Sequence, residues 1–222
     1  FELSSSEQEY LEVLKKWNYN NDIDEVGPTI WQNWHNSLTR LTWDEILNDS
    51  LALDYPFKYQ RAYLLKNNPT DSFMDIMDTP EIETANDLFK MAFKAAASKL
   101  DDLKSEGKSL EWGAAKATYI GHLLQALPAF SRHDLPIGGY SGIVNATSEN
   151  HGPSWRMIVE MTSPPTALGI YPGGQSGNPG SKYYDDMVDT WAAGEYLKLN
   201  FMQDKNNNDD VIFSQTLNPS NE

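Results

Sequence analysis

The glycine-rich stretch at residues 172–182, PGGQSGNPGSK, is the first place where residue types and spacing could do chemistry. A phosphate-binding P-loop needs a glycine directly before its lysine and a serine or threonine directly after it. Here Lys182 follows Ser181, and no glycine directly precedes the lysine. The nucleophile elbow of hydrolases needs G-x-S-x-G, whereas residues 174–178 read G-Q-S-G-N, with the second glycine one place too early. We therefore interpret the stretch as a tight irregular connection whose glycines permit positive φ.

The four histidines are the next candidates for chemistry: His35, His122, His133 and His151. None pairs with another at i, i+4, so a zinc site of the HExxH kind on a helix is absent. A Ser–His–Asp triad assembles in space rather than along the chain. An unrelated α+β hydrolase with His133 or His151 beside Ser141 or Ser176 therefore stays open as an alternative. We interpret His151 itself as a strand-edge residue that donates hydrogen bonds, with a direct catalytic role as the alternative.

Glu160 is the most notable carboxylate, because it stands inside the apolar stretch WRMIVEM. If this strand is central, a buried carboxylate needs a partner or its pKa rises. Arg156 lies four residues earlier, on the same face of a strand. Glu160 is therefore either half of a structural Arg–Glu pair, or a solvent-facing strand residue, or a supporting residue of a functional site.

The composition limits the classes of partner. Asp and Glu number 32 against 17 Lys and Arg, which gives a net charge of -15. This charge repels a phosphate backbone and an anionic membrane surface, so we expect neither a nucleic acid nor a membrane as partner. The chain has no cysteine, which excludes disulfides, a thiol nucleophile and a cysteine-ligated metal. Its start resembles no signal peptide, and because it begins at Phe1 we expect a processed chain or a fragment.

The elements that must position these residues divide the chain into a helical segment, 1–130, and a strand-rich segment, 131–222. Capping residues and apolar spacing predict the helices. These are 7–17, 28–41, a short helix capped by Thr42 and Glu45, 55–66, 80–104 with Thr79-Pro80 at its start, 112–127 and 183–196. One predicted strand follows the glycines at 138–139, and three others lie at 154–161, 166–173 and 211–219. The predicted fold class is α+β.

Three runs in the strand-rich segment together resemble a known family. They are GGYSGIVNAT, HGPSWRMIVEM and YPGGQSGNPGSKYYDDMVDTWAAGEYLKL. They are similar to the block that closes the β-subunit of penicillin acylases (penicillin amidases), in which HG-[P/A]-S-x-R is followed by PGGQSGNP and W-x-x-G-x-Y. The departure is Lys182-Tyr183, where members often have Pro-His. The helical stretch VLKKWNYNNDIDEVGPTIWQNWHNSL and the LEWG run at 110–113 also resemble the family.

The resemblance implies an N-terminal-nucleophile hydrolase that cleaves N-acyl amide bonds, of a β-lactam side chain or an acyl homoserine lactone. In this family the nucleophile is a serine at the new N-terminus of the β-subunit, and its own amine is the base. Phe1 cannot be that serine, so the resemblance implies that the chain is a C-terminal part of the β-subunit, inactive alone. Catalytic, cofactor and metal residues are expected elsewhere in the parent, including the ligands of any calcium. The supporting candidates here are Glu160, which in the cephalosporin acylase branch would orient a histidine, with His151 and Arg156.

The family fold is an αββα sandwich, which this chain would complete only in part. We therefore expect the N-terminal remainder of the same protein as partner, a small N-acyl substrate in the parent, and self-association of the isolated chain through exposed edges. The resemblance also implies export to the periplasm. A standalone, non-catalytic interaction domain of the same fold is the alternative.

Overall fold

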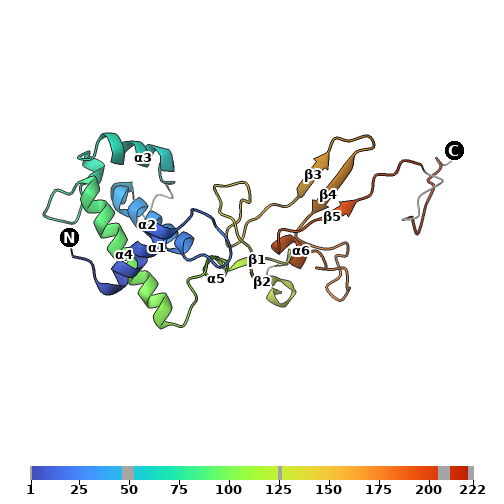
Figure 1. Cartoon of the computed structure of the whole chain (residues 1–222), viewed down its shortest axis with the longest axis horizontal. Helices are drawn as coiled ribbons and strands as arrows, with labels where there is room; N and C mark the ends of the chain where they lie inside the picture. Colours follow the sequence, from blue (N-terminus) through green and yellow to red (C-terminus); the bar gives the residue numbers. More distant parts are fainter. Residues whose placement is uncertain (1, 47–52, 125–126, 205–210, 220–222) are drawn as a thin grey trace.

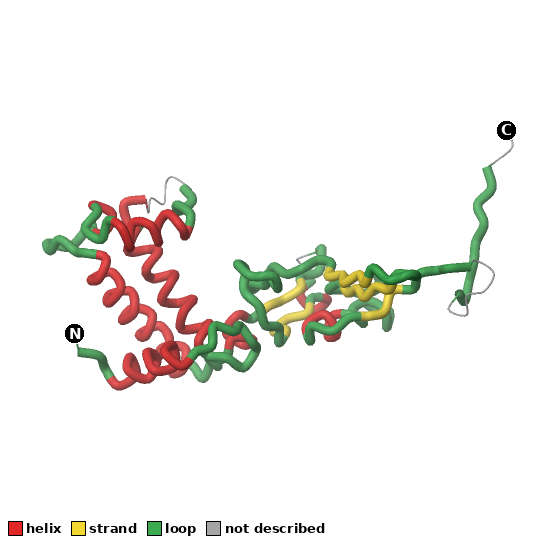
Figure 2. Tube along the Cα trace, turned by 45° about the horizontal axis from the view of Figure 1, so that its top comes forward, coloured by secondary structure: helices red, strands yellow, loops and turns green. Residues whose placement is uncertain are grey.

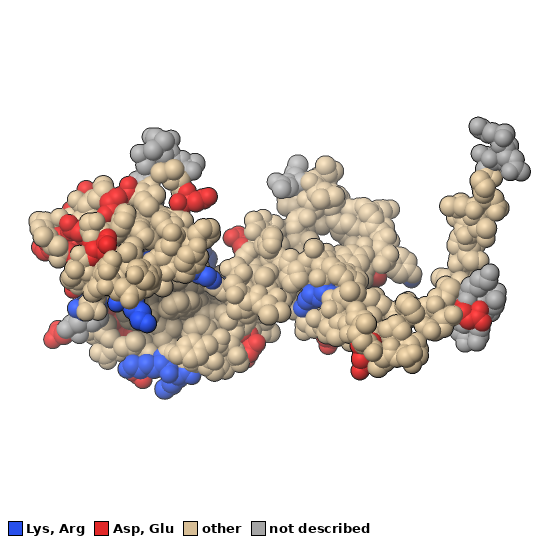
Figure 3. Space-filling model, turned by 90° about the horizontal axis from the view of Figure 1, so that it is seen from above, with Lys and Arg blue, Asp and Glu red and all other residues tan. Residues whose placement is uncertain are grey.

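The computed structural model describes residues 2–46, 53–124, 127–204 and 211–219. The molecule is elongated, with a helical lobe at one end, a strand-bearing lobe beside it and the two termini at opposite ends (Figure 1). Helices and strands lie largely in different parts of the chain (Figure 2). This confirms the α+β class. Acidic side chains gather on the end of the helical lobe, whereas lysine and arginine form a few separate patches (Figure 3).

Among the described residues, four longer helices build the helical lobe, and a short one leads out of it. They are α1 (Ser5–Lys16), α2 (Gly27–Thr42), α3 (Lys58–Asn67), α4 (Ala85–Ser105) and α5 (Trp112–Lys116). Short 3-10 turns occur at Asp44–Ile46, Ser72–Met74 and Pro128–Phe130. The predicted helices at 7–17, 28–41 and 55–66 are thereby confirmed within a few residues.

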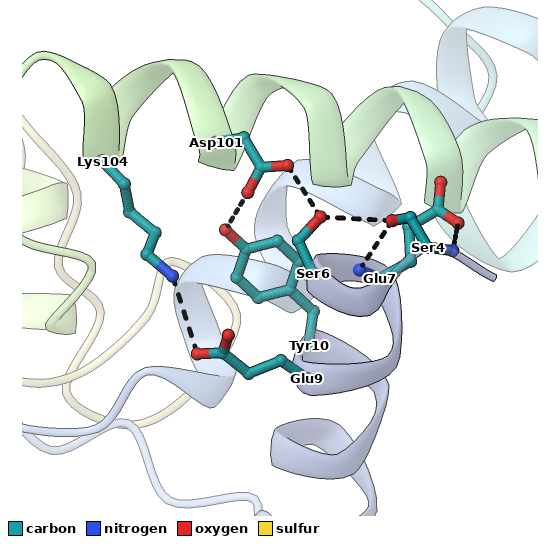
Figure 4. A network of polar contacts seen from close by, with 7 residues as sticks. All are labelled: Ser4, Ser6, Glu7, Glu9, Tyr10, Asp101 and Lys104. Carbon is teal, nitrogen blue, oxygen red and sulfur yellow. Dashed lines mark hydrogen bonds and ion pairs between the residues drawn. The ribbon is translucent and has the colours of Figure 1, made fainter.

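Helix α1 begins at a capping box that its sequence predicts. The Ser4 hydroxyl accepts from the amide of Glu7, and the Glu7 carboxylate accepts from the amide of Ser4 at 2.8 Å. The same helix is tied to α4, because Tyr10 donates to Asp101 at 2.7 Å and Ser6 donates to the other carboxylate oxygen at 2.9 Å (Figure 4). The hydrogen bond from Tyr10 lowers the pKa of Asp101. Because Tyr10 is also buried, the contact fixes the position of α1 on the lobe.

Helices α2 and α4 form the centre of the lobe. Their apolar stripes meet in two adjoining clusters, one containing Ile30, Phe93 and Leu100 and the other Leu38 and Leu88. These side chains are at most 6% exposed. Spacing of three, four and seven residues places such side chains on one helical face, so the periodicity predicts the apolar face of each helix.

Two predicted helix starts are wrong. Helix α4 begins at Ala85 rather than 80, because the Glu83 carboxylate accepts from the Ile76 amide at 3.0 Å and from the Thr79 hydroxyl at 2.8 Å and so closes a loop. Thr42 does not cap a new helix: it ends α2, and its hydroxyl donates to the Leu38 carbonyl at 2.7 Å. The continuation of that predicted helix beyond Ile46 lies outside the described residues.

The helices predicted at 112–127 and 183–196 are much shorter in the structure. Helix α5 ends at Lys116 because Ala117 adopts a left-handed conformation, φ 50°, and the chain then extends. The second, α6, spans only Val188–Ala192. Gly194, at φ 78°, follows its end.

In the described part of the chain, five short strands form two antiparallel sheets. Strands β1 (Thr118–Ile120) and β2 (Arg132–Leu135) make one sheet. Strands β3 (Arg156–Glu160), β4 (Thr166–Ile170) and β5 (Leu197–Leu199) make the other, in the order β3-β4-β5. The strands predicted at 154–161 and 166–173 are confirmed.

The other two strand predictions are wrong, and three strands were missed. The run after Gly139 turns back on itself, with the Tyr140 amide donating to the Asn145 carbonyl at 3.2 Å. Residues 211–219 are exposed and outside any sheet. Strands β1, β2 and β5 are only three or four residues long, too short for an alternating pattern to reveal them.

The strand-bearing lobe has a small core of its own. Leu135, Ile137 and Ile170 pack against Val188 and Trp191 of α6, all at most 2% exposed. Within the described parts of the chain, no helix is long and apolar enough to cross a membrane.

Candidate functional site

Arg156, at the start of β3, is the best-anchored of the candidate residues. Its guanidinium lies over the rings of Trp191 and Tyr196, at 5.5 Å from each centroid, and donates to the Trp191 carbonyl. Burial lowers the pKa of Arg156, although a guanidinium keeps its proton in proteins. The planar guanidinium contacts both rings and so holds Trp191 and Tyr196 together.

The His151-Gly152-Pro153 run closes the other side of Trp191. The indole Nε1 donates to the Pro153 carbonyl at 3.0 Å. A Cβ on Gly152 would lie 2.7 Å from the indole ring, so only glycine fits there. The motifs HG-P-S-x-R and W-x-x-G-x-Y, some 35 residues apart, are therefore two halves of one packing unit around Trp191.

The glycine-rich stretch forms a closed loop rather than a ligand cradle. The Ser176 amide donates to the Tyr183 carbonyl and the Met187 amide to the Gly173 carbonyl, both at 3.0 Å. Tyr171 donates to the Gly174 carbonyl at 2.8 Å. The interpretation as a tight connection fits these contacts, but its reason was wrong. Positive φ values among the described glycines fall at Gly107, Gly139 and Gly194, not here. At Gly174 the need is space, since a Cβ would lie 2.1 Å from the Tyr183 carbonyl oxygen.

A hollow of about 240 Å³ lies beside this loop. One wall carries Arg132, which donates to Asp185 at 2.7 Å and to Asp189 at 2.5 Å. The hydrogen bond to Asp185 raises the pKa of Arg132. On another side Tyr184 donates to the Phe130 carbonyl at 2.9 Å. Arg132 is thus held by two carboxylates of the same lobe, which favours a structural role.

Glu160 is exposed at the end of β3 opposite to Arg156. It is paired with Thr166 in the β3–β4 register, and the Thr166 hydroxyl donates to its carboxylate at 2.9 Å. The Arg–Glu pair is wrong, because four residues of strand separate the two Cα atoms by about 13 Å and Arg156 is bound to Trp191. The solvent-facing interpretation of Glu160 is confirmed.

His151 stands in a loop, not at the edge of a strand, so that prediction is wrong. It is exposed, and its carbonyl accepts from the Ser148 amide at 2.8 Å. The structure therefore brings Arg156 and the main chain next to His151 onto Trp191, and it leaves Glu160 apart. Among the described residues there is no cluster of three or more His, Asp or Glu side chains that could hold a metal ion.

Lys116 is a buried charge that sequence reasoning missed. It is 7% exposed, and its ammonium donates to the carbonyls of Gly138 and Gly139 at 2.8 and 3.2 Å and to the Thr147 hydroxyl at 2.6 Å. These three acceptors are neutral, so they replace hydration without supplying a counter-charge. Burial lowers the pKa of Lys116 to about 8. The signal in the sequence was weak, since a lysine ending the short run WGAAK is typical of an exposed helix end.

The same place joins the two lobes. The Gly139 amide donates to the Asn21 carbonyl at 2.8 Å, the Gly113 amide to Ile23 at 2.9 Å and the Trp112 amide to Glu25 at 2.8 Å. The loop at 19–25, helix α5 and the loop around Gly139 thus form one hydrogen-bonded junction. Its lysine fixes how the strand-bearing lobe follows the helical one.

The lowered pKa of Lys116 predicts a pH dependence of stability. Between pH 8 and the ordinary 10.5, the unfolded chain keeps a proton that the folded chain has released, so stability rises with pH. In urea unfolding, the free energy of unfolding of the native chain minus that of Lys116→Met should rise by up to about 3 kcal/mol across this window. A difference that stays flat or falls contradicts the prediction.

Comparison with known proteins places these motifs in a family. Residues 2–208 match the penicillin amidase family. The acyl-homoserine lactone acylase QuiP of Pseudomonas syringae pv. tomato is 26% identical over 195 residues, which cover 82% of this chain and 22% of that protein. QuiP of Pseudomonas aeruginosa is 27% identical over 204 residues, 81% of this chain and 23% of that protein. The chain thus spans less than a quarter of the length of these curated relatives. Because the family match covers nearly all of the chain, this protein belongs to the penicillin amidase family.

Proposed function

We propose that this chain is a C-terminal part of an amidohydrolase that cleaves N-acyl amide bonds, in a β-lactam side chain or an acyl homoserine lactone. The observation that carries the proposal is the family match over residues 2–208. The curated relatives named acyl-homoserine lactone acylase favour the lactone type of substrate. The hydrolase works in the periplasm, and the nucleophilic serine and the ligands of any calcium are supplied by the rest of the parent protein.

In this proposal the 222 residues are scaffold. The motif residues support it, because Arg156 and Trp191 contact each other and the main chain, and main-chain hydrogen bonds close the glycine-rich loop. Such a cluster holds strands and loops in place and has no group directed at a reacting bond. The isolated chain is therefore inactive, and activity requires the N-terminal remainder.

The test compares the isolated chain with the natural parent protein. The intact mass and N-terminal residue of each parent chain are determined, and hydrolysis of decanoyl-homoserine lactone and of penicillin G is followed by mass spectrometry. We expect a chain that begins with serine, and free acyl acid from the parent alone. A parent without a processed serine and without hydrolysis would instead favour a standalone interaction domain.

The three-stranded sheet predicts self-association of the isolated chain. On β3 the neighbours Met157 and Ile158 are 54% and 53% exposed, and successive strand residues point to opposite faces. Both faces of the sheet therefore expose apolar side chains, as expected if other parts of the parent cover them. Light scattering should show oligomers, or the chain should copurify with an N-terminal piece. A monodisperse monomer contradicts this.

Glu160 gives a prediction for the parent enzyme. If its carboxylate orients a histidine supplied by another segment, Glu160→Gln slows acyl transfer without unfolding the protein. The exposed position and the Thr166 hydrogen bond make a folding defect unexpected. Turnover of decanoyl-homoserine lactone is measured beside Thr166→Val, which removes the neighbouring hydroxyl alone. Unchanged turnover in Glu160→Gln would contradict a supporting role for Glu160.

A further inference from the structure

A second hollow, far from the motif block in sequence, opens in the helical lobe. It measures about 500 Å³ and lies where α3 passes over α2 and α4. Its apolar wall is made by Trp31, Trp34, Leu38, Leu65 and Phe89. The rings meet edge to face, with centroids 6.0 Å apart for Trp31 and Trp34 and 6.2 Å apart for Trp34 and Phe89. Size and lining match those of small-molecule sites, which are mostly apolar with few polar groups.

Among the described residues that line this hollow, the charged side chains are all cationic. They are Lys58, Arg61 and Lys66, in a chain whose net charge is -15. Arg61 is 5% exposed, the one buried side chain of α3. Its Nη1 donates to the His35 carbonyl at 3.3 Å and to the Thr39 hydroxyl. Both acceptors are neutral.

A buried guanidinium without a counter-ion is unfavourable, because the Coulomb attraction that would offset its desolvation is absent. The six ion pairs found in the described part of the chain do not include Arg61. Burial accordingly lowers the pKa of Arg61. A carboxylate placed in the hollow would supply the missing charge and accept two hydrogen bonds from the planar fork.

His35 supplies an independent second observation. It also lines the hollow, and its Nδ1 is buried with no hydrogen-bond partner among the described atoms. A buried polar atom without a partner is rare and is costly to maintain.

We propose that the hollow between α2, α3 and α4 binds an amphiphilic monocarboxylate, an unbranched aliphatic chain ending in a carboxylate. The aliphatic chain lies against the tryptophans, leucines and Phe89, and the carboxylate faces Arg61 and His35. A free phosphate would leave the apolar wall unused, and a neutral lipid would leave Arg61 without a counter-charge. The proposal is independent of the amide hydrolysis proposed above.

The first test is titration of the 222-residue chain with decanoate, followed by calorimetry and by tryptophan fluorescence. Butyrate keeps the carboxylate but lacks most of the aliphatic chain, and methyl decanoate keeps the chain but carries no charge. We expect decanoate to bind at least about tenfold more tightly than either. Absence of binding, or equal binding of methyl decanoate, overturns the proposal.

Variants locate the site. Ala62 lines the hollow from an exposed position on α3, so Ala62→Trp fills the space without disturbing the core. Arg61→Met removes the charge at similar volume. Both should weaken decanoate binding at least about tenfold, whereas Lys182→Met on the glycine-rich loop leaves it unchanged. Circular dichroism checks the folding of each variant. If Arg61→Met unfolds, the binding of decanoate to Ala62→Trp and the binding of methyl decanoate to the native chain test the site instead. Binding unaffected by Ala62→Trp contradicts the site.

The competing occupant is another segment of the parent protein that presents a carboxylate and an apolar side chain. The same decanoate titration of the intact parent separates the two. Binding that persists in the parent, and that Ala62→Trp weakens there, supports the ligand site. Binding seen with the isolated chain but lost in the parent overturns it and assigns the hollow to that segment.

Discussion

Trp191→Ala is expected to lower the free energy of unfolding of the strand-bearing lobe by about 4 kcal/mol, the usual loss for a buried tryptophan. Trp191 is 1% exposed at the centre of that core. Its removal leaves a cavity, takes away the donor to the Pro153 carbonyl, and removes one of the two rings that hold Arg156. Urea unfolding followed by near-ultraviolet circular dichroism measures the effect.

The matched control is Trp31→Ala in the helical lobe. Trp31 is 40% exposed, so the same chemical change should cost about 2 kcal/mol, because less apolar surface is lost and no enclosed cavity is left. Equal losses for the two variants would show that Trp191 is not the centre of the motif cluster. A clearly larger loss for Trp191→Ala agrees with HG-P-S-x-R and W-x-x-G-x-Y forming one packing unit.

Gly139→Ala should have a comparable effect for a different reason. Gly139 has φ 88°, in the left-handed region, and a Cβ there would lie 2.2 Å from the Asn145 carbonyl oxygen. The conformational strain alone costs about 1–2 kcal/mol, and the collision displaces the loop that accepts from Lys116 and Trp112. We expect a loss of at least about 3 kcal/mol in unfolding free energy, measured by urea denaturation.

Two other glycines separate strain from collision. Gly107 has φ 76° but nothing within 4 Å of an added Cβ, and Gly177 has open space without the left-handed φ. Gly107→Ala should therefore lower the free energy of unfolding by only about 1–2 kcal/mol. Gly177→Ala should leave it unchanged or raise it slightly. A cost for Gly139→Ala no larger than that for Gly107→Ala would show that the junction yields to the added methyl group, which contradicts the prediction.

Local rules predicted those helices whose ends are settled by neighbouring residues. The Ser4 cap and the proline at the start of α2 set two helix starts correctly, because a cap involves residues three positions apart. The start of α4 failed because Glu83 captures the Ile76 amide and the Thr79 hydroxyl before the helix begins. That competition is invisible to a pattern that treats Thr79-Pro80 as a cap.

The candidate site shows the same division. The sequence singled out Arg156 and Glu160 because a charge in an apolar strand is unusual, and it offered a pair between them as one of three interpretations. The structure gives Arg156 two aromatic rings from beyond residue 190 and gives Glu160 a threonine across the hairpin. Lys116 and Arg61 went unnoticed, because the burial of a cation depends on which distant segments cover it.

The sequence by itself determined the α+β class, the long amphipathic helices, the β3–β4 hairpin and membership of the penicillin amidase family. These follow from periodicity, turn residues and an ordered set of unusual residues, all of which are local properties of the chain. Only the tertiary structure decided that Trp191 organises the motifs, that a buried lysine joins the lobes, and that a cationic hollow opens under α3. Those features depend on contacts between residues far apart in sequence, and their energies come from burial, which a linear pattern does not specify.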